Sequence, residues 1–306
     1  MESETIIQSV NGVVVFLKVE VTKIYSFTST IGQGNPAGVV LDAQGLTEQQ
    51  MMKISQILQV SETAFLFPSE NADYHVRFFS PTCEVDLCGH ATIAAFTLVG
   101  KQHRHDKKQI KHFKQQTRAG MLKVDCYYDT NGVSKVLMEQ QDLEISSVEY
   151  DNDHIARALN ISLESLVSDL PKKRVSTGLF TLPICVYSLD TLKQMNPDFN
   201  FIKELCERYA VGSFHVFTFD TIKNSSLYHA RNFAPCYGIN EDPVTGTANG
   251  AVCSYLKKYE KIKTDHVICE QGDIINKSGR VQIDLSKRKV WVGGKAAIDT
   301  PQILDV

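Results

Sequence analysis

Two stretches of the chain, residues 77–92 and 231–249, share a plan that is suited to binding an anion and moving a proton. Each begins with an arginine, passes an aromatic residue and a proline, and runs through acidic residues into a glycine turn before an apolar segment. Backbone N–H groups at the start of a helix attract anions such as a substrate carboxylate. Two such turns that face each other would clamp a small molecule. The turn residues expected to contact it are Gly89, Gly246, Thr247 and Cys88.

Several side chains near the two turns are candidates for proton transfer. They are Glu62, Glu84, Asp86, His90, Glu241 and Asp242. One carboxylate alone is usually a solvated surface group, and one glycine before a helix usually only permits a tight turn. Because the turn is duplicated beside acids and a histidine, a functional site is favoured over these simpler explanations.

Two of these acids have the most informative surroundings. Glu62 lies between Ser61 and the apolar, strand-like residues 63–67, where partial desolvation suits a general base that works near neutral pH. Asp242 precedes Pro243, whose ring fixes the backbone close to the second turn. A histidine at a helix start could cap or pack as easily as act, so the residues alone leave the role of His90 open.

The candidates need a scaffold, and two segments that follow the turns are predicted to be its central helices. Residues 91–99 are apolar on nearly every side, and a helix without a polar face must be wrapped by other elements. Residues 248–256 form a similar, more polar segment. A sheet curled round each helix would bury it. Repetition at this long spacing is typical of two similar domains that face each other across a cleft, not of a solenoid.

Smaller elements fit between these helices. Residues 21–27, 61–67 and 74–79 are predicted strands, and Thr47 with Gln50 matches a capping box at the start of a helix. We predict that residues 1–18 are an extension outside the fold. The first domain should span residues 19–138 and the second residues 139–290, with a C-terminal strand within residues 291–306 packing back on the first.

Composition narrows the class of partner. The 306 residues carry a net charge of -3 with a pI near 6.3, which argues against nucleic-acid and membrane partners. No apolar run approaches the roughly 18 residues that span a bilayer. The eight cysteines are scattered without a CxxC pair, which predicts no metal site and a reducing, cytoplasmic compartment. The basic residues 101–114 are predicted to be a solvated connector, with an anion-binding site as the alternative.

Six motifs together resemble one known family, that of the PhzF-like phenazine-biosynthesis isomerases. In chain order they are Gly34-Asn35-Pro36-Ala37-Gly38-Val39, Ser61-Glu62-Thr63-Ala64-Phe65, Arg77-Phe78-Phe79-Ser80-Pro81, Cys88-Gly89-His90-Ala91-Thr92, Ser176-Thr177-Gly178-Leu179 and Glu241-Asp242-Pro243-Val244-Thr245-Gly246-Thr247-Ala248. The resemblance extends over about residues 19–303 and is specific as a set. It implies the α+β fold of diaminopimelate epimerase and proline racemase, with two pseudo-symmetric domains, each a mostly antiparallel β-sheet rolled round a central α-helix.

The resemblance also implies an activity, which is a proton shift within a small carboxylate-bearing substrate without a cofactor, in a homodimeric enzyme. Glu62 matches the glutamate that moves the proton in this family. His90, Asp242 and Thr247 match the family's active-site histidine, aspartate and serine. Thr247 is a departure, because its additional methyl group narrows the pocket and points to a different preferred substrate.

Related racemases use two opposed cysteines, one in each domain. This chain has Cys88 in the first turn but Thr245 in the second, and a threonine hydroxyl is too weak an acid or base at neutral pH to replace a thiolate. Cys88 is therefore expected to be a small buried hydrophobe near the site.

Three hypotheses follow from these residues. The leading one is a one-base isomerase in which Glu62 is the general acid and base, with His90 and Asp242 as the other catalytic residues. The second is an amino-acid epimerase or racemase that uses Glu62 and Cys88 as an opposed pair. The third is a small-molecule binder that kept the cleft and lost the chemistry.

Overall fold

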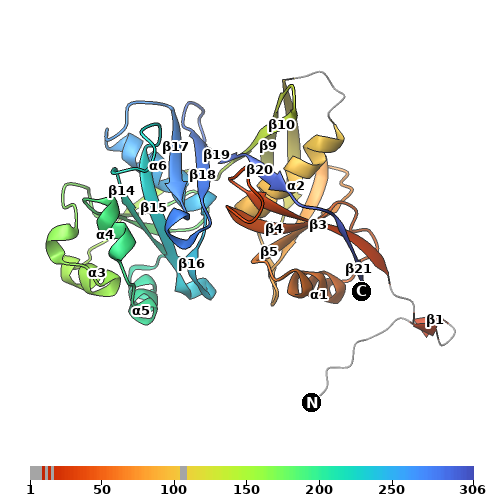
Figure 1. Ribbon diagram of the computed structural model, residues 1–306, viewed down its shortest axis with the longest axis horizontal. Helices are drawn as coiled ribbons and strands as arrows, with labels where there is room; N and C mark the ends of the chain where they lie inside the picture. Colours follow the sequence, from red (N-terminus) through yellow and green to blue (C-terminus); the bar gives the residue numbers. More distant parts are fainter. Residues whose placement is uncertain (1–8, 11–12, 15–16, 104–108) are drawn as a thin grey trace, which may run out of the picture.

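The protein forms two lobes of similar architecture, which lie side by side in Figure 1. The first lobe is built round α2 (Gly89–Gln102) and the second round α6 (Gly246–Lys258). In the computed structural model, a mostly antiparallel sheet curls round each of these helices. The predicted fold class, two pseudo-symmetric α+β domains with a central helix each, is confirmed.

The structure describes residues 9–10, 13–14, 17–103 and 109–306. The predicted extension, residues 1–18, falls mostly on residues outside this set, as does the centre of the basic stretch, residues 101–114. The elements before the first lobe are β1 (Ser9–Val10) and β2 (Val13–Val14), which pair with each other. Among the described residues, we find no helix that is both long enough and apolar enough to cross a membrane.

The strands of the first lobe are β3 (Lys18–Ser26), β4 (Asn35–Val40), β5 (Glu62–Phe67), β6 (Tyr74–Phe79), β7 (Glu84–Val85), β8 (Ile110–Thr117), β9 (Gly120–Asp129) and β10 (Gly132–Glu139). Those of the second lobe are β11 (Glu144–Ser147), β12 (Lys173–Ser176), β13 (Thr181–Cys185), β14 (Ser213–Thr218), β15 (Tyr228–Ala234), β16 (Ile239–Asp242), β17 (His266–Gln271), β18 (Gly279–Asp284) and β19 (Trp291–Gly294). The chain ends with β20 (Ala296–Ile298) and β21 (Gln302–Asp305).

Strand pairing repeats from one lobe to the other. In the first lobe β4 runs parallel to β5 and β6 parallel to β8, while β3–β4, β5–β6, β8–β9 and β9–β10 are antiparallel. In the second lobe β13 runs parallel to β14 and β15 parallel to β17, with antiparallel pairs at the matching places. Each lobe therefore places its central helix in the crossover between two parallel strands, after β7 or β16.

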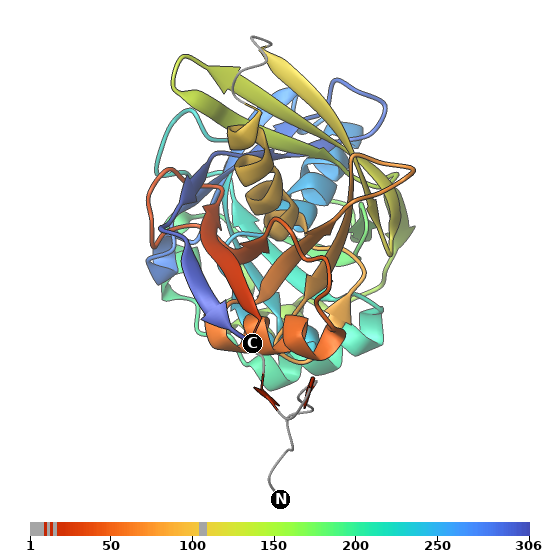
Figure 2. The same cartoon turned by 90° about the vertical axis from the view of Figure 1, so that its right-hand side faces the viewer.

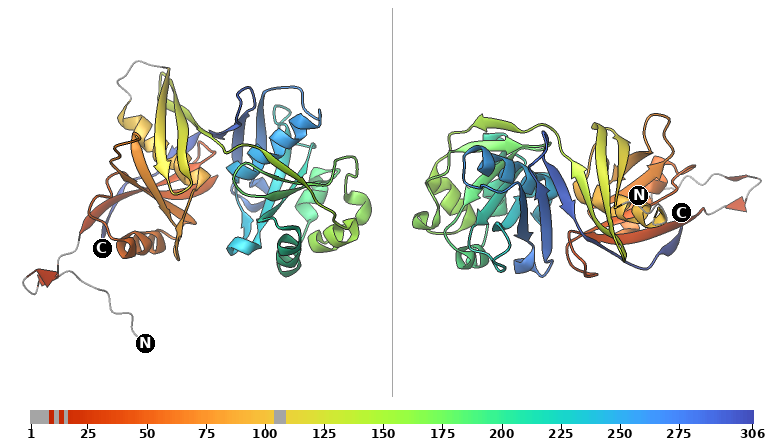
Figure 3. Two further views of the ribbon diagram at one scale, coloured as in Figure 1. Left: turned by 180° about the vertical axis from the view of Figure 1, so that it is seen from behind. Right: turned by 90° about the horizontal axis from the view of Figure 1, so that it is seen from above.

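The lobes are joined by hydrogen-bonded strands. β10 pairs antiparallel with β19, where Leu137 lies opposite Gly293. The chain changes lobe after each of these two strands. After β10 it enters the second lobe, where β11 pairs with β12, and after β19 it returns to the first lobe, where β20 pairs with β3. β21 also pairs with β3 and runs beside it in Figure 3. The numerical limits of the two domains stay predictions.

The remaining helices cover the outside of the sheets. They are α1 (Glu48–Leu58), α3 (Asn152–Leu159), α4 (Leu189–Gln194) and α5 (Phe199–Tyr209), with the short 3₁₀ turns η1 (Leu163–Ser165), η2 (Pro235–Tyr237) and η3 (Asp273–Ile275). The predicted capping box is confirmed, because Thr47 and Gln50 hydrogen-bond reciprocally at the start of α1. The wrapped helix is confirmed too, since nine residues of α2 are buried, among them Ile93 and Phe96.

A buried carboxylate stabilises the loop before β15. Glu270 is fully buried and accepts hydrogen bonds from the backbone N–H groups of Ile222 and Lys223, from the Ser226 hydroxyl, and from His229. Burial opposes the charge, yet these donors prevail and lower the pKa of Glu270 to about 2. The negative charge of Glu270 therefore stabilises the folded second lobe.

We predict that Glu270→Gln lowers the free energy of unfolding by roughly 3 kcal/mol at pH 7. The folded-state pKa is depressed, so this stabilisation is complete above the ordinary carboxyl pKa of 4.5 and is lost as the pH falls toward 2. Urea denaturation of wild type and variant between pH 7 and pH 3.5 should show the difference narrowing. Glu20→Gln, on the exposed side of β3, is the control. A difference that stays constant with pH would contradict the prediction.

Candidate active site

The first residues of the two central helices meet between the lobes. α2 begins at Gly89 and α6 at Gly246, as the turns predicted. A Cβ atom added to Gly89 would lie 3.6 Å from the Thr247 hydroxyl oxygen, so the two turns are in near contact. In Figure 2, which looks from the first lobe toward the second, α2 lies in front of α6. Neither helix has a side-chain cap, which leaves the N–H groups of both turns facing one small region.

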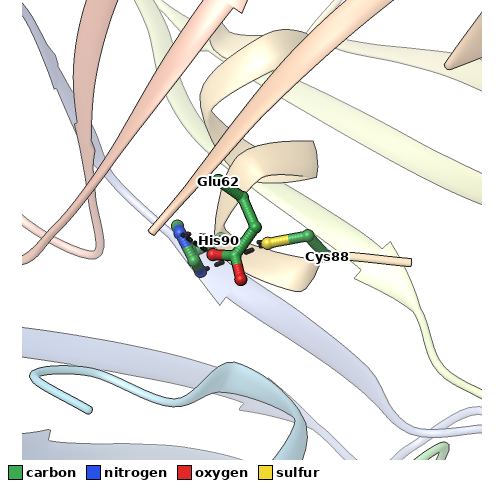
Figure 4. Close-up of side chains that lie close together, drawn as sticks. All are labelled: Glu62, Cys88 and His90. Atoms are coloured by element: carbon green, nitrogen blue, oxygen red, sulfur yellow. Dashed lines mark hydrogen bonds and ion pairs between the residues drawn. The ribbon is translucent and has the colours of Figure 1, made fainter. Parts of the chain in front are cut away.

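Three side chains of the first lobe gather beside this region, as Figure 4 shows. Glu62 is the first residue of β5, His90 the second residue of α2, and Cys88 the residue before that helix. Glu62 Oε2 lies 3.3 Å from His90 Nε2, and Cys88 Sγ lies 3.4 Å from His90 Nδ1. Ser61 Oγ is 3.2 Å from His90 Nε2 and steadies the ring from the side of β5. One donor atom from each of Glu62, Cys88 and His90 lies within 4.8 Å of the others.

The second lobe contributes Asp242, the last residue of β16. Its carboxylate accepts hydrogen bonds from the Thr245 hydroxyl, at 2.5 Å, and from Nδ2 of Asn35, at 2.8 Å. Asn35 is the first residue of β4 in the other lobe and is 1% exposed, so its bond crosses the interface away from water. It also donates to the carbonyl of Val244, at 2.9 Å. The amide of Asn35 therefore joins the lobes at the site.

Burial dominates the electrostatics of these groups. It raises the pKa of Asp242, while the charge of His90 and the hydrogen bond from Thr245 lower it and the charge of Glu62 raises it. Burial also raises the pKa of the Cys88 thiol well above its usual range, and the charge of Glu62 raises it further. Cys88 is thus held as a neutral thiol, which agrees with its predicted role as a small buried side chain.

The other acids near the turns lie elsewhere. Glu84 forms two hydrogen bonds with Arg77, at 2.8 and 2.7 Å, and Glu241 forms the same pair with Arg231, at 2.9 and 2.7 Å. These matching ion pairs brace the corner before each central helix. Asp86 is exposed and pairs with Arg118. Of the candidates for proton transfer, Glu62, His90 and Asp242 are the ones that come together.

Sequence reasoning missed the residues that hold Asp242 in place. Asn35 belonged to a recognised motif but had no assigned partner, since a contact across more than 200 positions has no local signal. Gln271, at the end of β17, hydrogen-bonds to Asp242 and Thr245, and no feature of its surrounding sequence marks it. Both are buried polar residues, and the presence of an asparagine or glutamine in a sequence does not predict whether its side chain is buried.

Glu62, Cys88 and His90 are also the described residues that come close enough to share a metal ion. A cysteine binds metal as a thiolate, and the buried thiol beside Glu62 resists losing its proton. His90 is in contact with Glu62, Ser61 and Cys88. The donor set therefore fits proton transfer within the cluster better than it fits a metal ion.

Comparison with known proteins agrees with this geometry. The family model described as "Phenazine biosynthesis-like protein" matches residues 24–300, and the chain belongs to this family. "Uncharacterized isomerase YfhB" of Bacillus subtilis is 37% identical over 292 residues, which cover 94% of this chain and 99% of the relative. "Uncharacterized isomerase" of Deinococcus radiodurans is 32% identical and covers 90% of this chain and 92% of its own.

Solved structures extend the likeness to the fold. The phenazine biosynthesis protein of the PhzF family from Bacillus anthracis superposes with a TM-score of 0.86 at 29% identity, over 95% of this chain and 100% of that chain. A hydroxyproline epimerase from Agrobacterium vitis gives a TM-score of 0.63 at 11% identity, over 94% of this chain and 93% of that one. The second match shows a shared fold only.

We predict that Cys88 is unreactive in the native protein, because a thiol must ionise before it attacks an electrophile. With iodoacetamide at pH 7.5, the exposed Cys83 should be alkylated at least about tenfold faster than Cys88. Peptide mapping by mass spectrometry at increasing times measures both rates in one sample. Rapid labelling of Cys88 would mean that it exists as a thiolate and would reopen the two-base mechanism.

Proposed function

We propose that this protein is an isomerase that shifts a proton within a small carboxylate-bearing substrate, with Glu62 as general acid and base and no cofactor. The observation that carries the proposal is the meeting of Glu62, His90 and Asp242 at the point where two uncapped helices begin. The carboxylate proposed for proton transfer, the second carboxylate and the N–H groups for an anion then face the same small space.

The N–H groups at the start of α2 and α6 bind the substrate carboxylate. These are the groups of Gly89, His90, Gly246 and Thr247. Removing a proton from the carbon α or vinylogous to that carboxylate creates an enolate-like charge, which the same donors stabilise by about 3 kcal/mol each. Glu62 takes the proton and returns it to another carbon of the same molecule, while His90 and Asp242 orient the substrate.

The relatives support the reaction class. Two of them carry the name isomerase at 37% and 32% identity. In this chain Thr247 lies at the start of α6 and close to Gly178, whose added Cβ atom would lie 3.7 Å from the threonine methyl group. That methyl group reduces the space above the second turn, which favours a substrate smaller than the phenazine precursor at this position.

A two-base epimerase is the alternative, with Glu62 and Cys88 as acid and base. Inversion at one carbon requires the two groups on opposite faces of the substrate. Here both belong to the first lobe and lie within 4.8 Å of each other beside His90. This shared side disfavours inversion and supports a proton shift served by one base.

We also propose a homodimer, which rests on the family resemblance, and a cytoplasmic location, which rests on the scattered cysteines. We expect no nucleic-acid or membrane partner and no resident metal. Sedimentation of the purified protein tests whether it is a homodimer. An exchange assay before and after dialysis against EDTA tests whether activity needs a metal ion.

We predict that Glu62→Gln lowers the rate of proton exchange by roughly 10²- to 10⁴-fold, because a carboxamide cannot accept the proton. The assay is proton NMR in deuterated water, with the enzyme added to dihydro-hydroxyanthranilate and to a panel of small carboxylates and amino acids. Loss of carbon-bound proton signals identifies the substrate class even where net product is small.

Glu70→Gln is the matched control, because Glu70 is an exposed glutamate that follows the same strand, β5. It should exchange at the wild-type rate. Unimpaired exchange by a folded Glu62→Gln enzyme would remove Glu62 from the mechanism. Absence of exchange by the wild type across the panel would favour the non-catalytic binder.

We expect Cys88→Ala to keep at least about a third of the exchange rate, because a neutral buried thiol contributes packing and little proton transfer. The same NMR assay, with optical rotation of any chiral substrate, measures the effect. Complete loss of activity together with racemisation by the wild type would establish the two-base alternative.

A further inference from the structure

A buried network of amides beneath the second turn has a single consistent direction of hydrogen bonding. It starts at Asn249, whose Nδ2 donates to the carbonyl of Thr245 at 2.8 Å. A carbonyl only accepts, so this contact fixes which end of the amide is the donor. The Tyr228 hydroxyl donates to the opposite end, Oδ1, at 2.9 Å. Asn249 is fully buried, which shields this orientation from water.

Gln271 is oriented in turn by two donors. Its Oε1 accepts from Nδ2 of Asn249 at 2.8 Å and from the backbone N–H of Thr245 at 3.1 Å. The other end, Nε2, can therefore only donate, and it does so to the carbonyl of Asp242 at 2.9 Å and to the Thr245 hydroxyl at 3.1 Å. With 1% of its surface exposed, Gln271 satisfies all four contacts inside the protein.

The orientation of Gln271 also fixes which atoms donate hydrogen bonds to the carboxylate of Asp242. Since the Thr245 hydroxyl accepts from Gln271, its own proton points to Oδ2 of Asp242, at 2.5 Å. Asn35, whose Nδ2 is fixed by the carbonyl of Val244, donates to Oδ1. Each oxygen of the Asp242 carboxyl thus receives a hydrogen bond, a pattern that favours the charged form.

These donors act against burial, which raises the pKa of Asp242. The titratable groups that face Asp242 are His90 of α2, Cys88 before it and Glu62 of β5. The hydrogen bonds from Asn35 and Thr245 can be removed without altering that set of charges.

We propose that Gln271 is a positioning residue, which sets the direction of the Thr245 hydroxyl and thereby holds Asp242 as a charged hydrogen-bond acceptor that faces the cluster. Asp242 then acts through its negative charge and does not deliver a proton. Because Asp242 belongs to the proposed active site, the consequence for turnover rests on the proposed function, while the consequence for the charge of Asp242 does not.

The test is a titration of Asp242 without any substrate. The protein carries ¹³C at the aspartate carboxyl carbons, and the signal of Asp242 is assigned by its loss in Asp242→Asn. Gln271→Met keeps the length of the side chain without its hydrogen bonds, and Thr245→Val keeps the shape without the hydroxyl. We expect both to raise the midpoint of Asp242, Thr245→Val by about one pH unit, because the charged form of Asp242 loses a donor. Gln271→Met acts indirectly, because the Thr245 hydroxyl loses the donor that directs its proton to Asp242.

Thr245→Ser restores the hydroxyl and should return the midpoint to the wild-type value. Gln140→Met is the matched control, because Gln140 is another buried glutamine, 3% exposed, whose amide donates to the carbonyl of Met138. It should leave Asp242 unchanged. An unshifted or lowered midpoint in folded Gln271→Met would overturn the proposal, and so would a Thr245→Ser protein that titrates like Thr245→Val. If Gln271→Met does not fold, the two Thr245 variants decide alone.

Proton exchange by the same variants separates this proposal from the proposed function. If both hold, the acid limb of the exchange rate moves to higher pH in Gln271→Met by the same interval as the titration, and Thr245→Ser reverses the change. A shifted midpoint with no exchange in any protein would contradict the proposed function and leave the role of Gln271 intact.

Discussion

The constraint on which the rest of the structure depends is the meeting of two uncapped helix starts between the lobes. N–H groups at a helix start need acceptors, and natural helices usually supply one from a side chain. Here Cys88 and Thr245 occupy the capping positions and neither side chain caps its helix. The arrangement is held by features outside the helices, namely the strand pair β10–β19, the exchange of β11 and β20 between lobes, and the bond from Asn35 to Asp242.

Much of this architecture can be predicted from local sequence, for identifiable reasons. α2 is apolar on nearly every side, which predicts a central helix wrapped by other elements. The capping box of Thr47 and Gln50 predicts the start of α1. The exchange of strands between lobes could not be predicted. β20 is a short strand, and its pairing with β3 depends on where β10 and β19 meet, which no property of its own residues determines.

The residues of the site also differ in whether local sequence predicts them. Glycine turns and a glutamate at a strand start are local patterns, which place Glu62, His90 and Asp242 among six candidates, and the family resemblance selects these three. The amides that orient Asp242, those of Asn35 and Gln271, are distant from it in sequence. Their roles could not be predicted, because they depend on partners that only the fold brings close. Glu84 and Glu241 show the converse, because local proximity to a turn made them candidates although each is paired with an arginine.

The pseudo-symmetry of the lobes is broken where chemistry would take place. Strand register makes Val85 the counterpart of Asp242, since Phe78 lies opposite Val85 and Asn232 opposite Asp242.

The same reasoning gives Glu62 a counterpart in Ser213, whose hydroxyl donates to Thr181 at 2.8 Å inside the second lobe. Thr245, opposite Cys88 in the repeat, accepts a hydrogen bond from Gln271 and donates its only hydroxyl proton to Asp242, so it has no proton to donate to a substrate. A symmetric pair of bases would need matching groups in both lobes. This chain instead has the proposed base, Glu62, in one lobe and the hydrogen-bonded carboxylate of Asp242 in the other, which fits the proposal that the two halves take different parts in one proton transfer.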